Sequence, residues 1–478
     1  MSTQRPTPVT ADGVSLERAH LVGVGGAGMS GIARILADRG YAVSGSDARD
    51  SPMLAGLAAR GVVTAVGHDA ANLQLIAGGP TAVVVSTAVR PDNPEVVAAR
   101  EAGIPVVRRA DGLAALMTGY RGVCIAGTHG KTSTTSMLTV ALQQAGLDPS
   151  FAIGGELTGS GLGAHHGEGD IFVAEADESD GSFLSFAPHG AVITNLEPDH
   201  LDHHGTAEAY TAVFDQFVDR IEPGGFLVAC IDDPGAAALA DRSERRRLVS
   251  YGRAPSATVR LLDHRPSGAP VVLVDDREIE LVLSVPGDHM LLNAVASLAA
   301  GVELGVDAQL MAEGLAAYTG VRRRFEHKGA VGGITVYDDY AHHPTEVAAQ
   351  IAAARGVLDI GAGDPSAARR RLVVVFQPHL YSRTETFADA FGVALGGADL
   401  VVVLDVYGAR EDPRPGVTGE LVASAVPDGG AAVLYHPNRS DAASFVAGVL
   451  EPGDIVITMG AGDVTAIGPE LLTLLEAT

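Results

Sequence analysis

Cysteine and long apolar runs are scarce in this sequence. The 478 residues include only two cysteines, Cys124 and Cys230, each inside an apolar stretch. Two isolated thiols do not make a disulfide framework, so they favour reduced, buried side chains in a cytoplasmic protein. We find no uncharged apolar run of about 18 residues, which argues against a membrane-spanning helix. The opening MSTQRPTPVTADG lacks the apolar core of a signal peptide, so we expect a cytoplasmic location.

Basic residues are also few, and lysine is the rarest of them. The formal net charge is −25, and lysine occurs only at positions 131 and 328. Binding to nucleic acid depends on neutralising phosphates, so this balance argues against a nucleic-acid partner. A small anionic ligand remains compatible with the composition, provided that its site gathers local positive charge.

Strand-like apolar runs alternate with helical patterns along most of the chain. This alternation predicts an α/β fold with parallel sheets, and 46% hydrophobic residues suffice for several cores. We place three domains at residues 1–118, 119–320 and 321–478. Within the second, residues 257–285 alternate apolar and turn-forming residues, which predicts an antiparallel portion.

The stretch CIAGTHGKTSTTS, residues 124–136, has the layout of a phosphate-binding loop between a strand and a helix. Glycines and the first helical turn would direct backbone N–H groups at phosphate oxygens. Lys131 would reach the β- and γ-phosphates, and the Thr132 hydroxyl would reach Mg²⁺. Ile125 stands where the usual pattern has a glycine, so the loop is a variant. A purely structural turn is the alternative, but the Lys-Thr pair at the helix start favours phosphate.

Acidic residues gather at two expected strand ends downstream of this loop. They lie in VAEADESD (173–180) and in TNLEPDHLDHH (194–204). Massed carboxylates repel one another in a cleft unless a cation lies between them, and Mg²⁺ prefers such oxygen ligands. A solvated acidic loop is the alternative for either segment alone, and zinc is the alternative metal for the histidines. The neighbouring phosphate loop favours magnesium.

A second glycine-rich turn lies near the N-terminus. VGVGGAGMSGIA (22–33) follows a strand and opens a helix, and Asp47 ends the next strand about twenty residues later. This is close to the dinucleotide-binding fingerprint of a Rossmann-like domain. The turn alone leaves two interpretations open, a docking site for a phosphate-bearing ligand or a tight structural turn.

Polar residues also cluster in the last third of the chain. VRRRFEHKG (321–329) is basic, while VYDDYAHHPTE (336–346) and QPHLYSRTE (377–385) follow strand-like runs. The basic cluster is either a solvated linker or a phosphate clamp beside a domain joint. The carboxyl ends of parallel strands are where α/β folds build their sites, so we expect binding residues in the other two segments.

In this order, the motifs GVGGAGMSGIA, GTHGKTSTTS, EADESDGSF, NLEPDHLDHH, DDYAHHPTE and QPHLYSRT resemble those of the Mur ligases, over about residues 15–470. The resemblance implies a Rossmann-like UDP-sugar-binding domain, a P-loop ATP-binding domain and a Rossmann-like amino-acid-binding domain. It implies an ATP-dependent ligase of peptidoglycan precursor synthesis. The substrates would be UDP-N-acetylmuramate and L-alanine, joined through an acyl phosphate, with ATP and two Mg²⁺ ions.

The resemblance also assigns roles to individual residues. Those expected at the UDP pyrophosphate are Gly23, Gly25, Gly26, Ala27, Gly28 and Met29, with Asp47, Ser86 and Thr87 nearby. Those expected at the ATP phosphates are Gly127, Thr128, His129, Gly130, Lys131, Thr132 and Ser133, with Thr132, Glu175 and His200 at Mg²⁺. His289 and Asn293 would face adenine, Arg324 the γ-phosphate and Asp339 the ribose. Tyr340, His342, His343 and Arg383 would line the amino-acid and muramoyl side. The expected catalytic residues are Lys131, Glu175, His200 and Arg324.

The sequence departs from the family pattern at two of these places. Met290 stands where the family usually has asparagine, and Leu380 where it often has arginine. Several relatives bridge their metals with a carbamoylated lysine, and with lysines only at 131 and 328 this chain has none available. Three alternatives remain open: a sibling ligase that recycles whole peptides, a small-molecule kinase, and a non-catalytic nucleotide-binding regulator.

Overall fold

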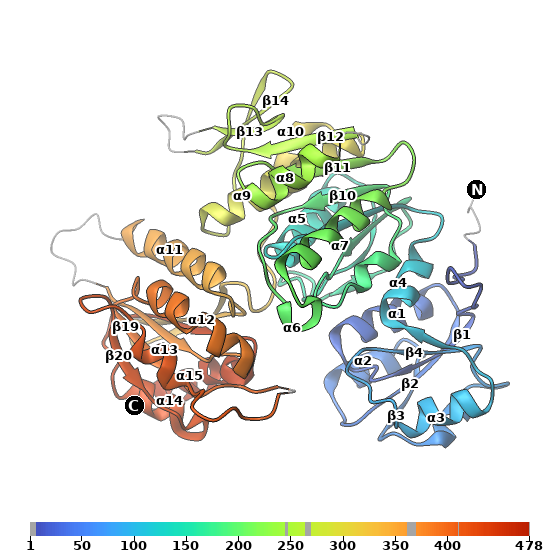
Figure 1. Cartoon of the computed structure of the whole chain (residues 1–478), viewed down its shortest axis with the longest axis horizontal. Helices are drawn as coiled ribbons and strands as arrows, with labels where there is room; N and C mark the ends of the chain where they lie inside the picture. The colour runs from blue at the N-terminus through green and yellow to red at the C-terminus, as the bar shows by residue number, and fades with distance from the viewer. Residues whose placement is uncertain (1–5, 244–246, 263–268, 361–369, 410, 478) are drawn as a thin grey trace. The chain divides into compact units, whose positions relative to one another are not determined.

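The structure is a computed structural model that describes residues 6–243, 247–262, 269–360, 370–409 and 411–477. Its helices and strands are labelled in Figure 1, and its contacts divide the chain into two compact units. The first comprises Met1–Leu283 and Leu292–Tyr318, and the second comprises Ser284–Leu291 and Thr319–Thr478. Among the described helices, none is long and apolar enough to cross a membrane. The domain boundaries expected at 118/119 and 320/321 stay predictions.

The first unit begins with a five-stranded sheet in the order β3-β2-β1-β4-β5, in which every neighbouring pair is parallel. This confirms the predicted Rossmann-like arrangement. The order reverses between β1 and β4, and ligands bind at such a switch point in parallel α/β sheets. The elements are β1 (Arg18–Val22), α1 (Ala27–Asp38), β2 (Ala42–Asp47), α2 (Pro52–Ala58), β3 (Val63–Val66), η1 (Ala70–Gln74), β4 (Ala82–Val85), α3 (Pro94–Glu101), β5 (Val106–Arg108) and α4 (Arg109–Met117).

A buried carboxylate ties this first sheet to its helices. The side chain of Glu95, on α3, is fully buried. Its Oε2 accepts a hydrogen bond from Ser46 Oγ at 2.6 Å, and its Oε1 accepts one from Asn72 Nδ2 at 2.5 Å. Burial opposes ionisation of Glu95, but hydrogen bonds from His20, Ser46 and Asn72 outweigh it and hold the pKa at about 2. The network fixes the end of β2, directly before Asp47.

The second sheet of the first unit has ten strands in the order β15-β14-β13-β12-β11-β10-β6-β9-β7-β8. Strands from β7 to β13 along this order are parallel, while β8, β14 and β15 pair antiparallel, which confirms the antiparallel portion predicted within residues 257–285. The strands are β6 (Arg121–Ala126), β7 (Ser150–Ala152), β8 (Ala164–His165), β9 (Ile171–Glu175), β10 (Gly190–Ile193), β11 (Phe226–Cys230), β12 (Arg247–Gly252), β13 (Val259–Leu262), β14 (Val271–Val274) and β15 (Arg277–Glu280). The helices are α5 (Lys131–Gln144), η2 (Ser182–Ser185), α6 (Leu201–His204), α7 (Ala207–Asp219), α8 (Pro234–Arg242), α9 (Asp288–Glu303) and α10 (Ala308–Ala316), and the start of α9, up to Leu291, belongs to the second unit.

Helix α5 follows the phosphate loop and is almost entirely buried, although it is rich in hydroxyl side chains. Thr135, Ser136 and Thr139 are fully buried, and each hydroxyl donates to the carbonyl four residues earlier, at 2.6–2.8 Å. These bonds satisfy the hydroxyls without a partner from outside the helix. Helix α5, which starts at the phosphate loop, can therefore bury these three side chains while it packs against α10.

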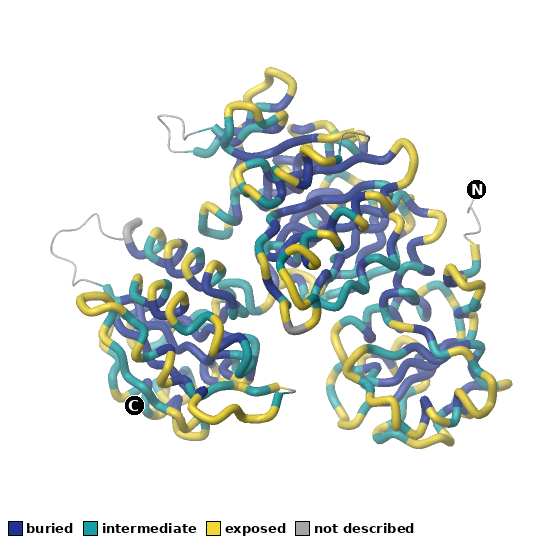
Figure 2. The backbone as a smooth tube through the Cα atoms, viewed as in Figure 1, coloured by how far each residue is buried: buried dark blue, intermediate teal, exposed yellow. Residues whose placement is uncertain are grey.

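The second unit contains a six-stranded sheet in the order β16-β17-β21-β18-β19-β20, parallel except for the pair β16–β17. One core packs α11, α12 and α13 on one face of the sheet, and another packs α14 and α15 on the opposite face. Figure 2 shows the resulting buried strands beneath helices whose outer sides are exposed. The elements are β16 (Glu326–Val331), β17 (Ile334–Asp339), α11 (Pro344–Ile360), β18 (Leu372–Phe376), α12 (Tyr381–Leu395), β19 (Leu400–Val403), α13 (Gly419–Ser424), β20 (Ala432–Tyr435), η3 (Arg439–Asp441), α14 (Ala442–Ala447), β21 (Ile455–Met459), η4 (Asp463–Ala466) and α15 (Ile467–Glu476).

Two strands are shorter than their apolar runs suggested. The strand-like segment TAVVVSTAV (81–89) predicts a strand to its end, but β4 stops at Val85, and Val89 N donates to Ser86 O in a turn. The strand-like segment AVITNLE (191–197) likewise extends beyond β10, which stops at Ile193. In both cases the chain leaves the sheet at its carboxyl edge. The polar residues that follow each strand therefore lie in a loop at that edge.

Candidate active site

The phosphate loop connects β6 to α5 through two glycines with positive φ. Gly127 has φ 128° and Gly130 has φ 82°, a region that other residues rarely adopt. A Cβ atom on Gly130 would lie 2.7 Å from Asn293 Oδ1, and one on Gly127 would overlap the Thr194 hydroxyl. Gly130 is also the N-cap of α5, so the free N–H groups of that helix begin at the loop. The predicted strand–loop–helix layout is confirmed.

Side chains after β10 hold this loop in place. Asn195 Oδ1 accepts a hydrogen bond from His129 N at 2.8 Å, and Asn195 Nδ2 donates to His129 O at 3.0 Å. Thr194 Oγ1 also donates to His129 O, and His129 Nε2 bonds to Glu197 Oε1. Thr128 Oγ1 donates to the carbonyl of Glu197 at 2.9 Å. The segment TNLE therefore positions the loop, which its acidic composition alone did not indicate.

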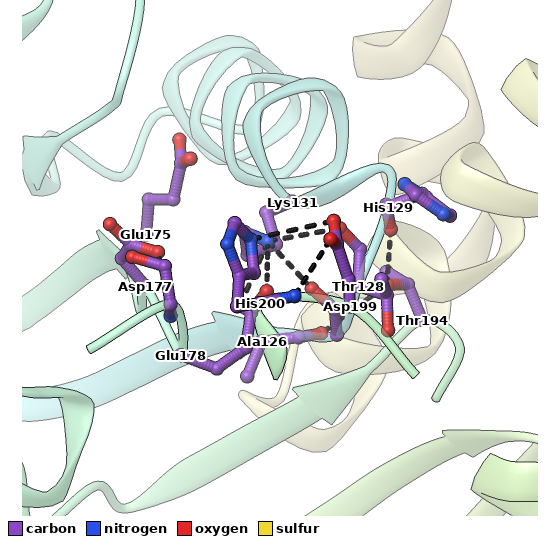
Figure 3. A network of polar contacts seen from close by, with 12 residues as sticks. Ala126, Thr128, His129, Lys131, Glu175, Asp177, Glu178, Thr194, Asp199 and His200 are labelled. Carbon is purple, nitrogen blue, oxygen red and sulfur yellow. Dashed lines mark hydrogen bonds and ion pairs between the residues drawn. The ribbon is translucent and has the colours of Figure 1, made fainter. Parts of the chain in front are cut away.

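The Lys131 ammonium points back into the loop and pairs with a buried carboxylate. Its Nζ lies 2.9 Å from Glu178 Oε1 and 2.8 Å from Oε2, and it donates to Gly127 O and Thr128 O at 2.8 and 3.1 Å (Figure 3). Burial raises the pKa of Glu178 to about 7, against the opposing effect of Lys131. Burial alone would lower the pKa of Lys131, but Glu178 and Asp177 raise it, so the amine is charged.

Oxygen ligands suited to a metal ion meet at the start of α5. The Thr132 hydroxyl donates to Glu175 Oε1 at 3.0 Å, and Gly154 N donates to Oε2 at 2.7 Å. A hydroxyl and a carboxylate oxygen beside a phosphate loop are the hard donors that Mg²⁺ prefers, so these residues fit that ion. His200 has φ 51°, and its Nε2 lies 3.5 Å from Oδ2 of the buried Asp199. Figure 3 shows Glu175 and Asp177 on the same side of Lys131.

The glycine-rich turn after β1 lies at the switch point of the first sheet. Gly23 has φ 75°, and Gly25 N donates to Asp47 Oδ2 at 2.9 Å. Asp47 therefore supports the turn itself, which accounts for its position at the end of β2. Gly26 is the N-cap of α1, and no acidic residue lies in the first turn of this helix, so its N–H groups can receive an anion.

The other residues predicted at this turn differ in exposure. The Met29 side chain is buried in the core, so only its backbone can face a ligand. Ser86 and Thr87 follow β4, beside β1, and Thr87 is exposed. A Cβ on Gly28 would lie 2.8 Å from Arg109 Nη1, which brings an unpredicted guanidinium over the turn.

A third group of predicted residues gathers in the second unit around Tyr340. The guanidinium carbons of Arg323 and Arg324 lie 4.7 and 5.2 Å from its ring centroid. Asp339 accepts hydrogen bonds from Phe325 N and Ala341 N, each at 2.7 Å. Arg323 and Phe325 have φ 59° and 50°, so Asp339 stabilises a strained turn that presents Arg324. Burial raises the pKa of Asp339 to about 6.

The histidines of this group have different environments. Burial lowers the pKa of His342 to about 3, with Arg383 adding to the effect, and its Nδ1 lies 3.0 Å from Tyr340 O. His343 is buried and packs edge-on against Phe387 at 5.1 Å. Burial and Arg324 lower the pKa of His289, which is one helical turn before Asn293 on α9. Asn293 itself lies in the first unit against Gly130.

The structure also identifies residues near these sites that sequence reasoning did not assign. Glu178 lies in the segment 173–180 and Asn195 in the segment 194–204. Their partners, Lys131 and His129, are distant from them in sequence. Tyr210 is fully buried, with its hydroxyl 3.0 Å from Thr128 Oγ1 and 3.4 Å from Glu178 Oε1. No local sequence signal distinguishes Tyr210 from an ordinary core aromatic.

Comparison with known proteins decides the family. Three family models match the chain. The model described as "Mur ligase family, catalytic domain" matches residues 18–121, "Mur ligase middle domain" matches residues 125–301, and "Mur ligase, glutamate ligase domain" matches residues 323–462. A UDP-N-acetylmuramate–L-alanine ligase of Saccharopolyspora erythraea is 61% identical over 477 residues, 98% of this chain and 96% of that protein. The chain belongs to the Mur ligase family.

Other Mur ligases support this assignment. The UDP-N-acetylmuramate–L-alanine ligase of Mycobacterium tuberculosis is 54% identical, covering 100% of this chain and 97% of that protein. The crystal structure of the UDP-N-acetylmuramate–alanine ligase of Thermotoga maritima has a TM-score of 0.76 and 28% identity, covering 96% of this chain and 99% of that one. A murein peptide ligase of Psychrobacter arcticus, at 24% identity and a TM-score of 0.70, over 96% of this chain and 99% of that one, shares the fold.

Proposed function

We propose that this Mur ligase joins L-alanine to the lactyl carboxylate of UDP-N-acetylmuramate at the expense of ATP, in the cytoplasm. The supporting observation is 61% identity over 98% of the chain to a relative named for that reaction. The phosphate loop and the glycine-rich turn supply two phosphate-binding elements on neighbouring sheets of one unit. Two phosphorylated substrates need two such elements.

In the first step the lactyl carboxylate attacks the γ-phosphorus of ATP, giving an acyl phosphate and ADP. Two anions must approach each other, so the site has to supply positive charge at the phosphates. Lys131 is held charged by Glu178 and would move from the loop carbonyls to the phosphate oxygens. The N–H groups at the start of α5 add roughly half a unit charge. Arg324 is our candidate for the γ-phosphate.

Magnesium fits the oxygen donors of Thr132 and Glu175, which lie within hydrogen-bond distance of one another. When bound, the ion would neutralise phosphate charge and orient the transferring group. His200 is a candidate third ligand from the other acidic segment. Glu175→Gln should raise the Mg²⁺ concentration required for half-maximal activity by 10-fold or more, since the neutral amide is a weaker ligand.

In the second step the neutral amine of L-alanine attacks the acyl phosphate, and phosphate leaves. One proton must pass from the amine to a base. The pKa of His342, at about 3, makes it a weak proton acceptor in the ligand-free protein. His200 is the other histidine candidate for this proton, a role that it could fill only without Mg²⁺ on its imidazole.

The decisive test is an amino-acid panel with ADP release as the readout. Purified protein, UDP-N-acetylmuramate, ATP and Mg²⁺ are mixed with L-alanine, glycine, L-serine or a tripeptide. We expect turnover with L-alanine. Release of ADP only with the tripeptide would identify a peptide-recycling ligase, and a stable phosphorylated product without any amine would identify a kinase.

A further inference from the structure

A basic side chain lies over the glycine-rich turn of the first sheet. Arg109 is the first residue of α4, and its Nη1, Cδ and Cζ atoms would lie 2.8, 3.1 and 3.5 Å from a Cβ on Gly28. The guanidinium therefore covers the first turn of α1, where the free N–H groups of that helix are found. Any side chain at position 28 would displace it, so glycine at this position leaves room for arginine.

The Arg109 guanidinium is half-buried, yet it lacks a protein partner within hydrogen-bond distance among the residues that the structure describes. Burial raises the pKa of Asp177, but Lys131 and hydrogen bonds from Ser179 lower it, and Arg109 adds a smaller lowering effect. The Arg109 guanidinium is therefore close enough to Asp177 to influence its ionisation. An arginine offers five N–H donors in a rigid fork that matches phosphate geometry. A half-buried fork without an acceptor is incomplete until an anion binds.

Helix α4 is anchored so that the position of Arg109 is fixed. Asp111, in its first turn, accepts a hydrogen bond from Ser185 Oγ at 2.6 Å. Leu113 and Leu116 are buried beneath the helix. The adjacent Arg108 has 69% of its side chain exposed and is paired with Asp111. The two neighbouring arginines therefore have different environments. Arg108 forms an ion pair at the surface, whereas Arg109 lies over the glycine-rich turn.

We propose that Arg109 binds the diphosphate of the UDP-sugar substrate, closing over it from α4 while the glycine-rich turn and α1 hold it from below. The proposal rests on the proposed function. The same guanidinium lies near Asp177 of the ATP-binding sheet, so it orders the substrate's diphosphate next to the site of phosphoryl transfer. Arg109 is a binding and positioning residue and takes no proton from the reaction.

The test separates a diphosphate contact from a structural role. Arg109→Ala, Arg109→Lys and the control Arg108→Ala are compared with the parent for binding of UDP and of uridine, measured by calorimetry. Uridine has the same base and sugar without the diphosphate. We expect Arg109→Ala to weaken UDP binding by roughly 10- to 100-fold and to change uridine binding little. Arg109→Lys should recover part of the loss, and Arg108→Ala should match the parent.

Kinetics give the second readout. Arg109→Ala should raise the KM for UDP-N-acetylmuramate while leaving the KM for L-alanine within about threefold of the parent. Equal weakening of UDP and uridine, or unchanged UDP binding, would overturn the proposal. A parent protein that binds UDP but does not release ADP with L-alanine would instead refute the proposed function, and the UDP–uridine comparison would still decide the role of Arg109.

Discussion

The pair formed by Lys131 and Glu178 makes a sharp prediction. Lys131→Met removes the only ammonium within hydrogen-bond distance of Glu178 among the described residues and leaves a fully buried carboxylate without its counter-ion. Breaking a buried ion pair from one side costs about 3–5 kcal/mol of stability. Adding Glu178→Gln removes the carboxyl that would otherwise be buried as a charge or have to keep a proton, so the double variant should regain most of that loss. Activity should be lost in both, because neither retains the cation at the phosphates.

The stability that Lys131→Met loses relative to the parent should grow as the pH rises above 7. The pKa of Glu178 is raised from its ordinary 4.5 to about 7, so the folded parent keeps a proton that the unfolded chain releases. The parent therefore loses stability as pH rises from 4.5 to 7, at about 1.4 kcal/mol per pH unit, and then levels off. Without Lys131 the pKa of Glu178 rises further, so the loss continues above pH 7. The gap between parent and variant should widen by up to about 1.4 kcal/mol per pH unit there.

Scanning calorimetry from pH 6 to 8.5 measures this gap as a difference in unfolding midpoint. The matched control is Lys328→Met, which removes the other lysine, whose side chain is 24% exposed and whose Nζ lies 3.2 Å from Glu326 Oε1. Such a pair contributes about 0–1 kcal/mol. If Lys131→Met is no less stable than Lys328→Met across the range, or if Glu178→Gln fails to restore stability, the buried-pair argument is wrong.

Two further predictions concern other parts of the first unit. Gly130→Ala places a Cβ 2.7 Å from Asn293 Oδ1 at φ 82°, so it should cost about 1–3 kcal/mol and raise the KM for ATP; full activity and an unchanged melting midpoint would contradict this. Glu95 has a pKa lowered from 4.5 to about 2, so its contribution is complete above pH 4.5 and is lost as pH falls to 2, by up to about 3 kcal/mol. In Glu95→Gln that acid-dependent loss should be smaller by a similar amount, and an unchanged acid-unfolding profile would count against the network.

The sequence was sufficient for features that depend on local pattern. Apolar runs separated by glycine turns marked the strands, and GTHGKT at the start of a hydroxyl-rich helix marked the phosphate loop, because glycine with positive φ and a free helix N-terminus are local requirements. The antiparallel portion within residues 257–285 was likewise visible as alternation. Strand ends were less certain, because β4 and β10 end at Val85 and Ile193, before the segments 81–89 and 191–197 end.

Features that depend on tertiary partners were not visible. Asp47 was expected near the ligand, and the structure shows its carboxylate accepting from Gly25 N, a contact set by the pairing of β1 with β2. Glu178 differs from its acidic neighbours only because it is buried against Lys131. Arg109 has no motif, and its position over Gly28 depends on how α4 packs against α1. The roles of the predicted site residues toward ligands stay predictions.

The hydrogen bonds between Asn195 and His129 have a consequence for the energetics of nucleotide capture. Because Asn195 bonds to both the N–H and the carbonyl of His129, the loop has its curved shape before any nucleotide arrives. The entropy of ordering that backbone is then spent during folding, and an arriving triphosphate finds its donors already aimed. In Asn195→Ala the loop would have to become ordered when the nucleotide binds. The affinity for the nucleotide would therefore fall, although every group expected to contact phosphate is still present.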